Sequence, residues 1–134
     1  MKKIVKMIVW AALAAFCLTS CYKEEGGIKP YYQVGSEYSI DFVNGGIRPI
    51  ILLYEDNFLN KDFTSEAEAL SKITAFYENN KGIGITPSAR EYLKIFIVRY
   101  IPQEESETSV RMVPDPDYKS PKTYVWDKNG SREE

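Results

Sequence analysis

The start of the chain limits what the rest of it can become. Lys2, Lys3 and Lys6 are followed by an apolar run from residue 7 to residue 17 that carries no charge. A basic start followed by an apolar stretch of this length is typical of a secretory signal peptide. A helix that crosses a bilayer needs about 20 apolar residues, so this run is too short to be one. We therefore expect residues 1–20 to be a cleaved export signal, which leaves 114 residues to fold.

The residues at the end of this run indicate which kind of export signal it is. Leu18-Thr19-Ser20-Cys21 joins a branched aliphatic residue, two small residues and a cysteine. This pattern resembles the lipobox of bacterial lipoproteins. The resemblance implies signal-peptidase recognition of Leu18, Thr19 and Ser20, diacylglycerol on the Cys21 thiol, cleavage before Cys21, and palmitate-like acylation of the new amino group. The alternative is an ordinary signal peptide that ends near a chance cysteine. Two or three acyl chains would anchor the protein stably to a membrane.

A short charged element comes after the cysteine. Lys23, Glu24 and Glu25 resemble the export signal of surface lipoproteins in Bacteroidota-type bacteria. The resemblance implies a lipid anchor in the outer membrane, with the protein facing the cell exterior. The alternative is a charged linker that only stays solvated. In either case we expect residues 21–30 to comprise the lipidated cysteine and a flexible tether.

Composition removes several kinds of chemistry. The chain without residues 1–20 has 14 basic and 19 acidic residues, a net charge near −5, which disfavours a nucleic-acid partner. The chain has no histidine, Cys17 leaves with the signal, and Cys21 is consumed by lipid. These facts exclude Ser-His-Asp and Cys-His catalysis, and also zinc, copper or haem sites with His or Cys ligands. Carboxylate, lysine, tyrosine or arginine chemistry and oxygen-ligated cations remain open.

The first half of the folded part predicts a hairpin. Residues 37–43 alternate between apolar and polar side chains, which indicates a strand. Asn44-Gly45-Gly46 is a strong hairpin-turn signal. Residues 50–54 read as a strand covered on both faces, with Pro49 at its start or on an edge. We therefore expect residues 37–43 to pair with residues 47–54.

The second half predicts a helix and then further strands. Residues 65–79 have apolar side chains at helical spacing behind a Ser65/Glu68 capping box. Residues 87–91 predict a short helical turn with a second capping box, Ser88 and Glu91, and the branched and aromatic residues of 92–101 favour a strand. Whether 87–101 is helix or strand stays open. Four further segments are predicted in order: a polar loop at 103–108, short strands at 110–113 and 123–126, and a polar tail at 127–134.

These elements predict one α+β domain over residues 31–126. It consists of an antiparallel sheet of four to six strands with one main amphipathic helix packed on one face.

Two groups of acidic residues are candidate sites. Oxygen ligands for calcium are offered by Asp115, Asp117, Asp127 and Asn129, although the bidentate glutamate of a calcium loop is missing and turn chemistry explains them equally well. Paired carboxylates for glycoside hydrolysis are offered by Glu104, Glu105 and Glu107. Three acids in one polar loop are usually solvated, so neither site is our leading prediction, and we assign no cofactor or metal.

Aromatic residues suggest a binding surface. All ten tyrosines and Trp126 remain after cleavage, and Tyr118, Tyr124 and Trp126 are the candidate ligand contacts. The alternative is that these rings fill the ends of a small core. We expect a non-enzymatic accessory lipoprotein that binds a protein or a glycan. A carboxylate-dependent hydrolase and a structural subunit that pairs through strand edges are the other two possibilities.

Overall fold

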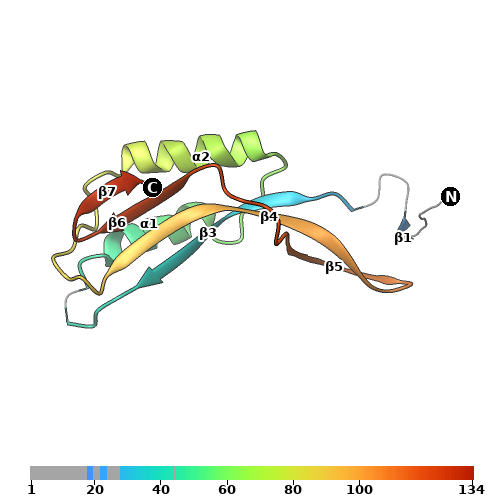
Figure 1. The fold of residues 1–134 in the computed structure, drawn as a ribbon, viewed down its shortest axis with the longest axis horizontal. Coiled ribbons are helices and arrows are strands. Elements are labelled where there is room, and N and C mark those ends of the chain that lie inside the picture. Colours follow the sequence, from blue (N-terminus) through green and yellow to red (C-terminus); the bar gives the residue numbers. More distant parts are fainter. Residues whose placement is uncertain (1–17, 20–21, 24–27, 44) are drawn as a thin grey trace. The chain divides into compact units, whose positions relative to one another are not determined.

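The computed structural model describes residues 18–19, 22–23, 28–43 and 45–134. It divides the chain into two compact units, each described below by itself: a hairpin unit, Met1–Tyr31 with Arg99–Pro116, and a core unit, Tyr32–Val98 with Asp117–Glu134. The elements, in chain order, are β1 (Leu18–Thr19), β2 (Tyr22–Lys23), β3 (Tyr31–Ser39), α1 (Arg48–Phe58), α2 (Glu66–Asn79), β4 (Tyr92–Ser106), β5 (Ser109–Pro114), β6 (Thr123–Asp127) and β7 (Gly130–Glu133) (Figure 1).

The main sheet has five antiparallel strands in the order β3-β4-β6-β7, with β5 also paired to β4. The first half of β4 pairs with β6, from Tyr92 opposite Asp127 to Phe96 opposite Thr123. The second half of β4 pairs with β5. The short strands β1 and β2 form a separate parallel pair. The predicted α+β class with an antiparallel sheet of four to six strands is confirmed.

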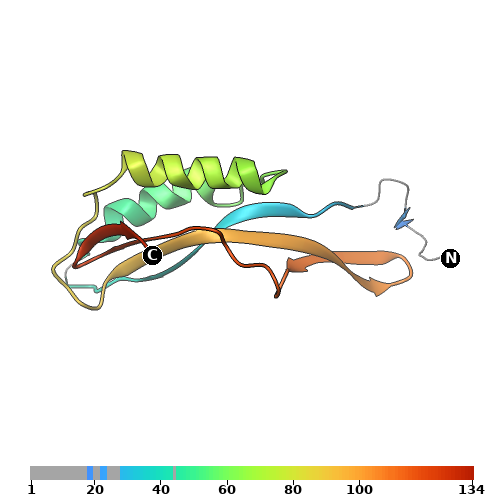
Figure 2. The same cartoon turned by 45° about the horizontal axis from the view of Figure 1, so that its top comes forward.

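In the core unit, both helices lie on one face of the sheet (Figure 2). Helix α2 is the predicted amphipathic helix. One half of its predicted capping box is present, since the Ser65 side chain accepts a hydrogen bond from the Glu68 N–H at 3.1 Å, while the Glu68 carboxylate accepts from the Thr64 N–H at 3.4 Å. Between the helices and the sheet lies one hydrophobic core, built from Val34, Ile47, Ile50, Ile51, Tyr54, Phe58, Phe63, Ala69, Ile73, Phe76, Leu93, Ile95, Ile97, Tyr124 and Trp126.

The predicted hairpin of residues 37–43 with 47–54 is wrong, because residues 48–58 form helix α1. The apolar run 50–54 suits a strand by propensity, but its buried residues continue a helical spacing through Ile47, Ile50, Ile51, Tyr54 and Phe58. Pro49 lies in the first turn of the helix, where its missing N–H costs nothing. Burial of one helical stripe against the sheet outweighs the β-propensity of the run.

Three further boundaries differ from the prediction. Residues 87–91 form turns rather than a helix. The strand predicted at 92–101 is confirmed, but β4 continues to Ser106, so most of the predicted loop 103–108 is strand. Residues 130–133 of the predicted polar tail form β7, which pairs with β6 around a turn at Lys128 and Asn129. The Gly130 backbone has φ 102°, so the Asn-Gly pair at 129–130 marks a hairpin, whereas the element that follows Gly45 is helix α1.

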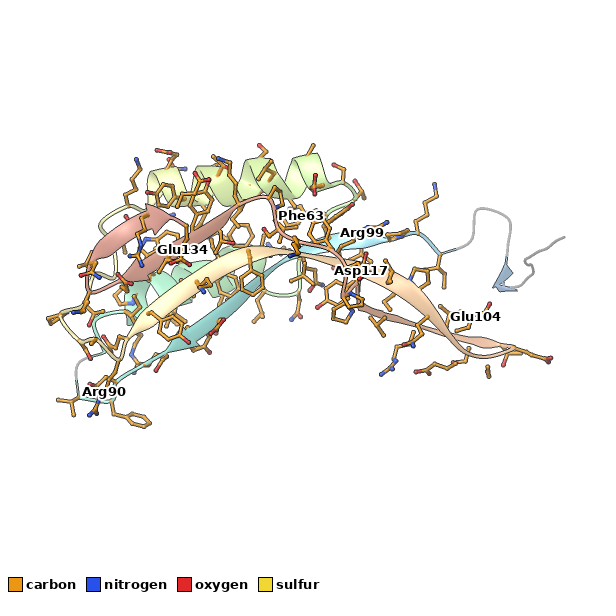
Figure 3. All side chains as sticks on the ribbon, in the orientation of Figure 1. Phe63, Arg90, Arg99, Glu104, Asp117 and Glu134 are labelled. Carbon is orange, nitrogen blue, oxygen red and sulfur yellow. The ribbon has the colours of Figure 1, made fainter. Side chains whose placement is uncertain are left out.

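The hairpin unit consists mainly of the second half of β4 paired with β5. The strand predicted at 110–113 is confirmed as part of β5. Its charged residues pair along the ribbon: Arg99 contacts Asp115 at 2.9 Å and Arg111 contacts Glu105 at 2.6 Å. Figure 3 labels Arg99 and Glu104, both of which belong to β4. Tyr31 stacks on Tyr100 with ring centroids 5.2 Å apart.

The lipobox prediction falls largely outside the described residues. Leu18 and Thr19 form β1 and Lys23 lies in β2, whereas the other four residues singled out there are not described: Ser20, Cys21, Glu24 and Glu25. Within the described part of the chain, no helix has the length and hydropathy needed to cross a bilayer.

Candidate functional site

The two aromatic residues predicted to contact a ligand from β6 lie in the core. Tyr124 and Trp126 are buried beneath α2, where the Tyr124 hydroxyl lies 3.3 Å from the Thr74 hydroxyl and the Trp126 indole N–H donates to the Asn80 carbonyl at 3.1 Å. The Tyr77 ring stacks on Tyr124 with centroids 4.3 Å apart. The expectation of an exposed aromatic face on β6 is therefore corrected: these rings have no free face to offer a ligand.

Tyr118 is half-buried and has partners of its own. Its hydroxyl donates to Glu66 at 2.6 Å, and its ring meets Tyr32 edge to face with centroids 5.7 Å apart. It ties the segment before β6 to the start of α2. The three aromatic candidates therefore do not form a common surface.

The acidic candidates are engaged in separate local contacts. Asp115 pairs with Arg99, and Asp127 accepts two hydrogen bonds from Arg132 at 2.9 and 3.0 Å. The Arg132 guanidinium holds the pKa of Asp127 below its ordinary value. Asn129 donates its backbone N–H to Asp127 at 2.9 Å, so this segment is a hairpin turn. No group of three acidic side chains converges as a metal site within the described residues.

The remaining acidic candidates lie around the β4–β5 turn and after β5. Glu104, Glu105 and Glu107 are exposed, and Glu105 is paired with Arg111. Asp117 lies in the turn that comes after β5 and is also exposed.

A groove of about 410 Å³ lies between α1 and α2. Buried aromatic rings form its floor, and polar side chains stand on its rim. Its lining consists of Leu53, Asn57, Phe58, Lys61, Phe63, Lys72, Ala75, Phe76, Asn79 and Asn80. A volume of several hundred Å³ is typical of sites for small ligands. Of the labelled side chains in Figure 3, Phe63 belongs to this lining.

The charge of the groove is opposite to that of the protein. Lys61 and Lys72 line it, and no Asp or Glu does among the residues that the structure describes, although the whole chain has a net charge of −2. Neither lysine forms an ion pair with another described residue. The groove therefore offers two uncommitted cations over a low-polarity floor, an arrangement that attracts anions.

Two asparagine side chains add directional hydrogen-bonding groups. Asn57 donates its amide to the Leu53 carbonyl at 2.8 Å, which leaves its own oxygen as an acceptor. The Asn79 amide has no hydrogen-bond partner among the described residues. A side-chain amide presents both donors and an acceptor, so the rim can match hydroxyl groups as well as charge.

The floor of the groove is fixed by the core beneath it. The Phe76 ring packs edge to face against Phe58, with centroids 5.2 Å apart, and against Trp126, with centroids 5.8 Å apart. Asn80 closes the end of α2, since its amide donates to the Phe76 carbonyl at 2.7 Å while its own carbonyl accepts from Trp126. Trp126 therefore supports the groove through its contact with the Phe76 ring.

Sequence reasoning missed the groove entirely. Lys61 belongs to the α1–α2 connection and Lys72 to α2, and the floor takes one phenylalanine from each of three segments. No motif joins these positions. The available signal was weak: α2 carries one lysine among three glutamates.

A second polar arrangement in the core unit is fully internal. Glu91 is buried beside β4 and accepts hydrogen bonds from the Asp41 N–H at 2.9 Å, the Ile47 N–H at 3.3 Å and the Thr86 hydroxyl at 2.5 Å. Its sequence assignment to a local capping box with Ser88 is therefore corrected. Glu91 instead caps helix α1 from another element, because Ile47, the N-cap residue, has no side-chain cap.

Hydrogen bonding keeps this carboxylate ionised. Burial alone would raise the pKa of Glu91, but hydrogen bonds from the Thr86 hydroxyl and from the N–H groups of Asp41, Ile47 and Gly45 outweigh it, so the pKa lies below its ordinary value of 4.5. The negative charge also lies at the positive end of the α1 dipole. All of these interactions are made within the protein, which indicates a structural role.

No protein-family model matches the chain, and neither a curated protein nor a solved structure is detectably similar to it. Family membership therefore gives no guide to function. The chemistry of the α1–α2 groove is the strongest functional indication in the core unit.

Proposed function

We propose that the chain is a non-enzymatic, lipid-anchored protein of the outer membrane, facing the cell surface, whose core unit binds an acidic glycan in the α1–α2 groove. The lipobox and the element after it support the location. The observation that carries the binding role is the pair of uncommitted lysines, Lys61 and Lys72, in a groove whose described lining has no acidic residue.

The groove suits a sugar that carries a carboxylate or a phosphate. Each lysine supplies a mobile point charge for the anionic group. Asn57 and Asn79 supply directional donors and acceptors for hydroxyl groups, which an acidic peptide would use less. Leu53 and Ala75 add apolar contact area for the carbon face of a sugar ring.

The same lining disfavours hydrolysis at this groove. Hydrolysis of a glycoside by the usual mechanism needs two carboxyl groups about 5–10 Å apart across the bound sugar. The described lining of the groove presents no carboxyl group. Binding without turnover is therefore the function that its chemistry supports best.

The binding proposal is tested by titrating the detergent-solubilised full chain with oligosaccharides in a calorimeter. A uronic-acid oligosaccharide should bind, and a neutral one of equal length should bind at least about tenfold more weakly. The double substitution Lys61→Glu and Lys72→Glu should abolish binding of the acidic sugar. Lys119→Glu with Lys128→Glu makes the same charge change at exposed positions outside the groove and should leave binding intact.

Three outcomes would overturn this proposal. Equal affinity for acidic and neutral sugars would remove the role of the lysines. Equal loss in the two double variants would reduce the effect to net charge. Tighter binding of a poly-glutamate peptide than of the acidic sugar would reassign the groove to a protein partner.

The anchor is tested separately. Cys21→Ala should abolish metabolic labelling with radioactive palmitate and release the protein from membranes. Replacement of Lys23, Glu24 and Glu25 by alanine should protect the protein from protease added to whole cells. Membrane association that survives Cys21→Ala, or unchanged protease access, would contradict the location.

A further inference from the structure

Two apolar side chains project from the loop between β3 and α1. Phe42 is 98% exposed and Val43 is 92% exposed. Ile85, 40% exposed, belongs to the α2–β4 connection, whose backbone packs against this loop where Gly46 meets Thr86 and the Ile85 carbonyl. Figures 1 and 2 show the two connections at the same end of the core unit. We call Phe42 and Val43 the apolar tip.

Hydrogen bonds within the protein hold the backbone of the loop that carries the apolar tip. The Val43 N–H donates to the Asp41 carboxylate at 2.9 Å, and the Gly45 N–H donates to the Asp41 carbonyl at 2.9 Å. The Asp41 N–H in turn donates to buried Glu91 at 2.9 Å. These three backbone donors of the loop are therefore satisfied within the protein, while the Phe42 and Val43 side chains are exposed. Satisfied backbone groups can enter a low-polarity medium at little cost.

Two arginines flank the apolar tip. Arg48 begins α1 and Arg90 lies in the turn before β4, where Figure 3 shows it at this end of the unit. Both are exposed, and neither forms an ion pair within the described chain. The nearby carboxylates of Asp41 and Glu91 accept backbone hydrogen bonds instead. Both Asp41 oxygens accept hydrogen bonds, from the Val43 N–H and from the Ser88 hydroxyl at 3.4 Å, and Glu91 is buried, so the two arginines are the exposed charges that these carboxylates leave unpaired.

We propose that the apolar tip inserts into a lipid surface that carries anionic headgroups, with Arg48 and Arg90 contacting those headgroups. Apolar side chains beside arginines at a protruding turn have the chemistry of interfacial membrane binding, in which the apolar groups reach the acyl boundary and the cations stay at the headgroups. A protein interface would need a broader patch, since two protruding side chains cover little area. This inference is independent of the α1–α2 groove.

The experiment uses a fluorescent residue at the tip of the full chain. The tip variant, Phe42→Trp, is mixed with vesicles of phosphatidylglycerol and phosphatidylcholine that contain brominated acyl chains, which quench tryptophan only at short range. The parent chain is measured in parallel, so that the emission of its native tryptophans can be subtracted. Leu52→Trp is the matched control variant, because Leu52 is an exposed apolar residue of α1, 53% exposed, that lies outside the tip.

We expect the added tryptophan of the tip variant to be quenched by the anionic vesicles and not by phosphatidylcholine alone. The added tryptophan of the control variant should stay unquenched in both. Arg48→Glu with Arg90→Glu, introduced into the tip variant, should weaken the quenching at least about tenfold. Val43→Ser should weaken it by a smaller factor, with unchanged circular dichroism as the check on folding.

Three results would overturn the proposal. The first is a tip variant whose added tryptophan is not quenched by anionic vesicles. The second is equal quenching in the tip and control variants. The third is a blue shift of the tip variant's emission that lipid-free envelope protein produces and vesicles do not, which would assign the apolar tip to a protein partner.

Discussion

The Glu91 network and the α1–α2 groove are both polar regions of the core unit, but their groups are used in opposite ways. Around Glu91, carboxylate, hydroxyl and backbone N–H groups are buried and bonded to one another. Around the groove, Lys61, Lys72 and Asn79 have no partner among the described residues. The first region is needed to hold the fold together, whereas the second leaves its groups available for a ligand.

The cost of burial explains this difference. A buried polar group left without a partner costs about 1–3 kcal/mol, so selection for folding alone supplies the partners of Glu91. A solvated lysine on a rim needs no partner, because water satisfies it. The lack of acidic residues in the described lining of the groove is therefore not required by stability, and it is the feature that points to a ligand.

The largest effect is expected from Glu91→Ala. It removes the shared acceptor of the Thr86 hydroxyl and of the Asp41 and Ile47 N–H groups, and the free energy of unfolding should fall by about 3 kcal/mol or more. Urea denaturation measured by circular dichroism gives this loss. Glu107→Ala removes an exposed carboxylate and should change stability little. A loss below about 0.5 kcal/mol for Glu91→Ala would break the contrast between the two regions.

A smaller loss is expected from Trp126→Phe. The change removes the indole hydrogen bond to the Asn80 carbonyl and leaves a small cavity under Phe76, which together should cost about 1–3 kcal/mol of unfolding free energy. Thermal denaturation with and without the acidic sugar measures it. A variant of unchanged stability that fails to bind the sugar would restore Trp126 as a ligand contact.

A pH dependence should accompany the Glu91 network. The pKa of Glu91 is lower in the folded chain than in the unfolded one, so its contribution to stability is present above the ordinary value of 4.5 and is lost as the pH falls through the folded pKa. Glu91→Gln cannot titrate. The wild-type protein should therefore exceed this variant in urea midpoint at about pH 7, and the difference should shrink by about pH 3. A difference that stays constant over this range would assign the effect to shape alone.

The smallest effect on folding is expected at the groove. Lys61→Ala and Lys72→Ala should each change the free energy of unfolding by less than about 0.5 kcal/mol, because both side chains are solvated. The same variants should weaken binding of the acidic sugar. Chemical denaturation and calorimetry on the same samples separate the two effects. A large stability loss would place these lysines with Glu91, as parts of the fold.

Elements with local signals were predictable from the sequence. The capping box at Ser65 and Glu68 and the apolar spacing behind it are contained within α2, so its limits were found closely. The branched and aromatic residues of β4 likewise have an intrinsic preference for strands, and they form one. Helix α1 was missed because its cap, Glu91, lies 44 residues away from Ile47. Its apolar run fits a strand and a helix equally well until the face of the sheet is known.

The candidate site was beyond sequence reasoning for a similar reason. The exposure of Trp126 depends on whether α2 covers β6, and that is a property of the packing. The two Asn-Gly pairs make the same point: the pair at 129–130 turns a hairpin, while Gly45 provides a backbone N–H and a positive φ of 62° ahead of a helix. A turn signal predicts that the chain bends, but it does not predict whether a strand or a helix follows the bend.

The distant cap of α1 also affects the order in which parts of the core unit become stable during synthesis. Ile47 and the first turn of α1 are made 44 residues before Glu91, the residue that completes them. Until Glu91 has been made, the N-terminal amides of α1 have water as their partner in place of a carboxylate. We therefore expect α1 to be among the last parts of the core unit to become stable, although it is the first helix of that unit. For the export that we propose, such a delay is useful, because an early, stable helix would resist passage through a membrane.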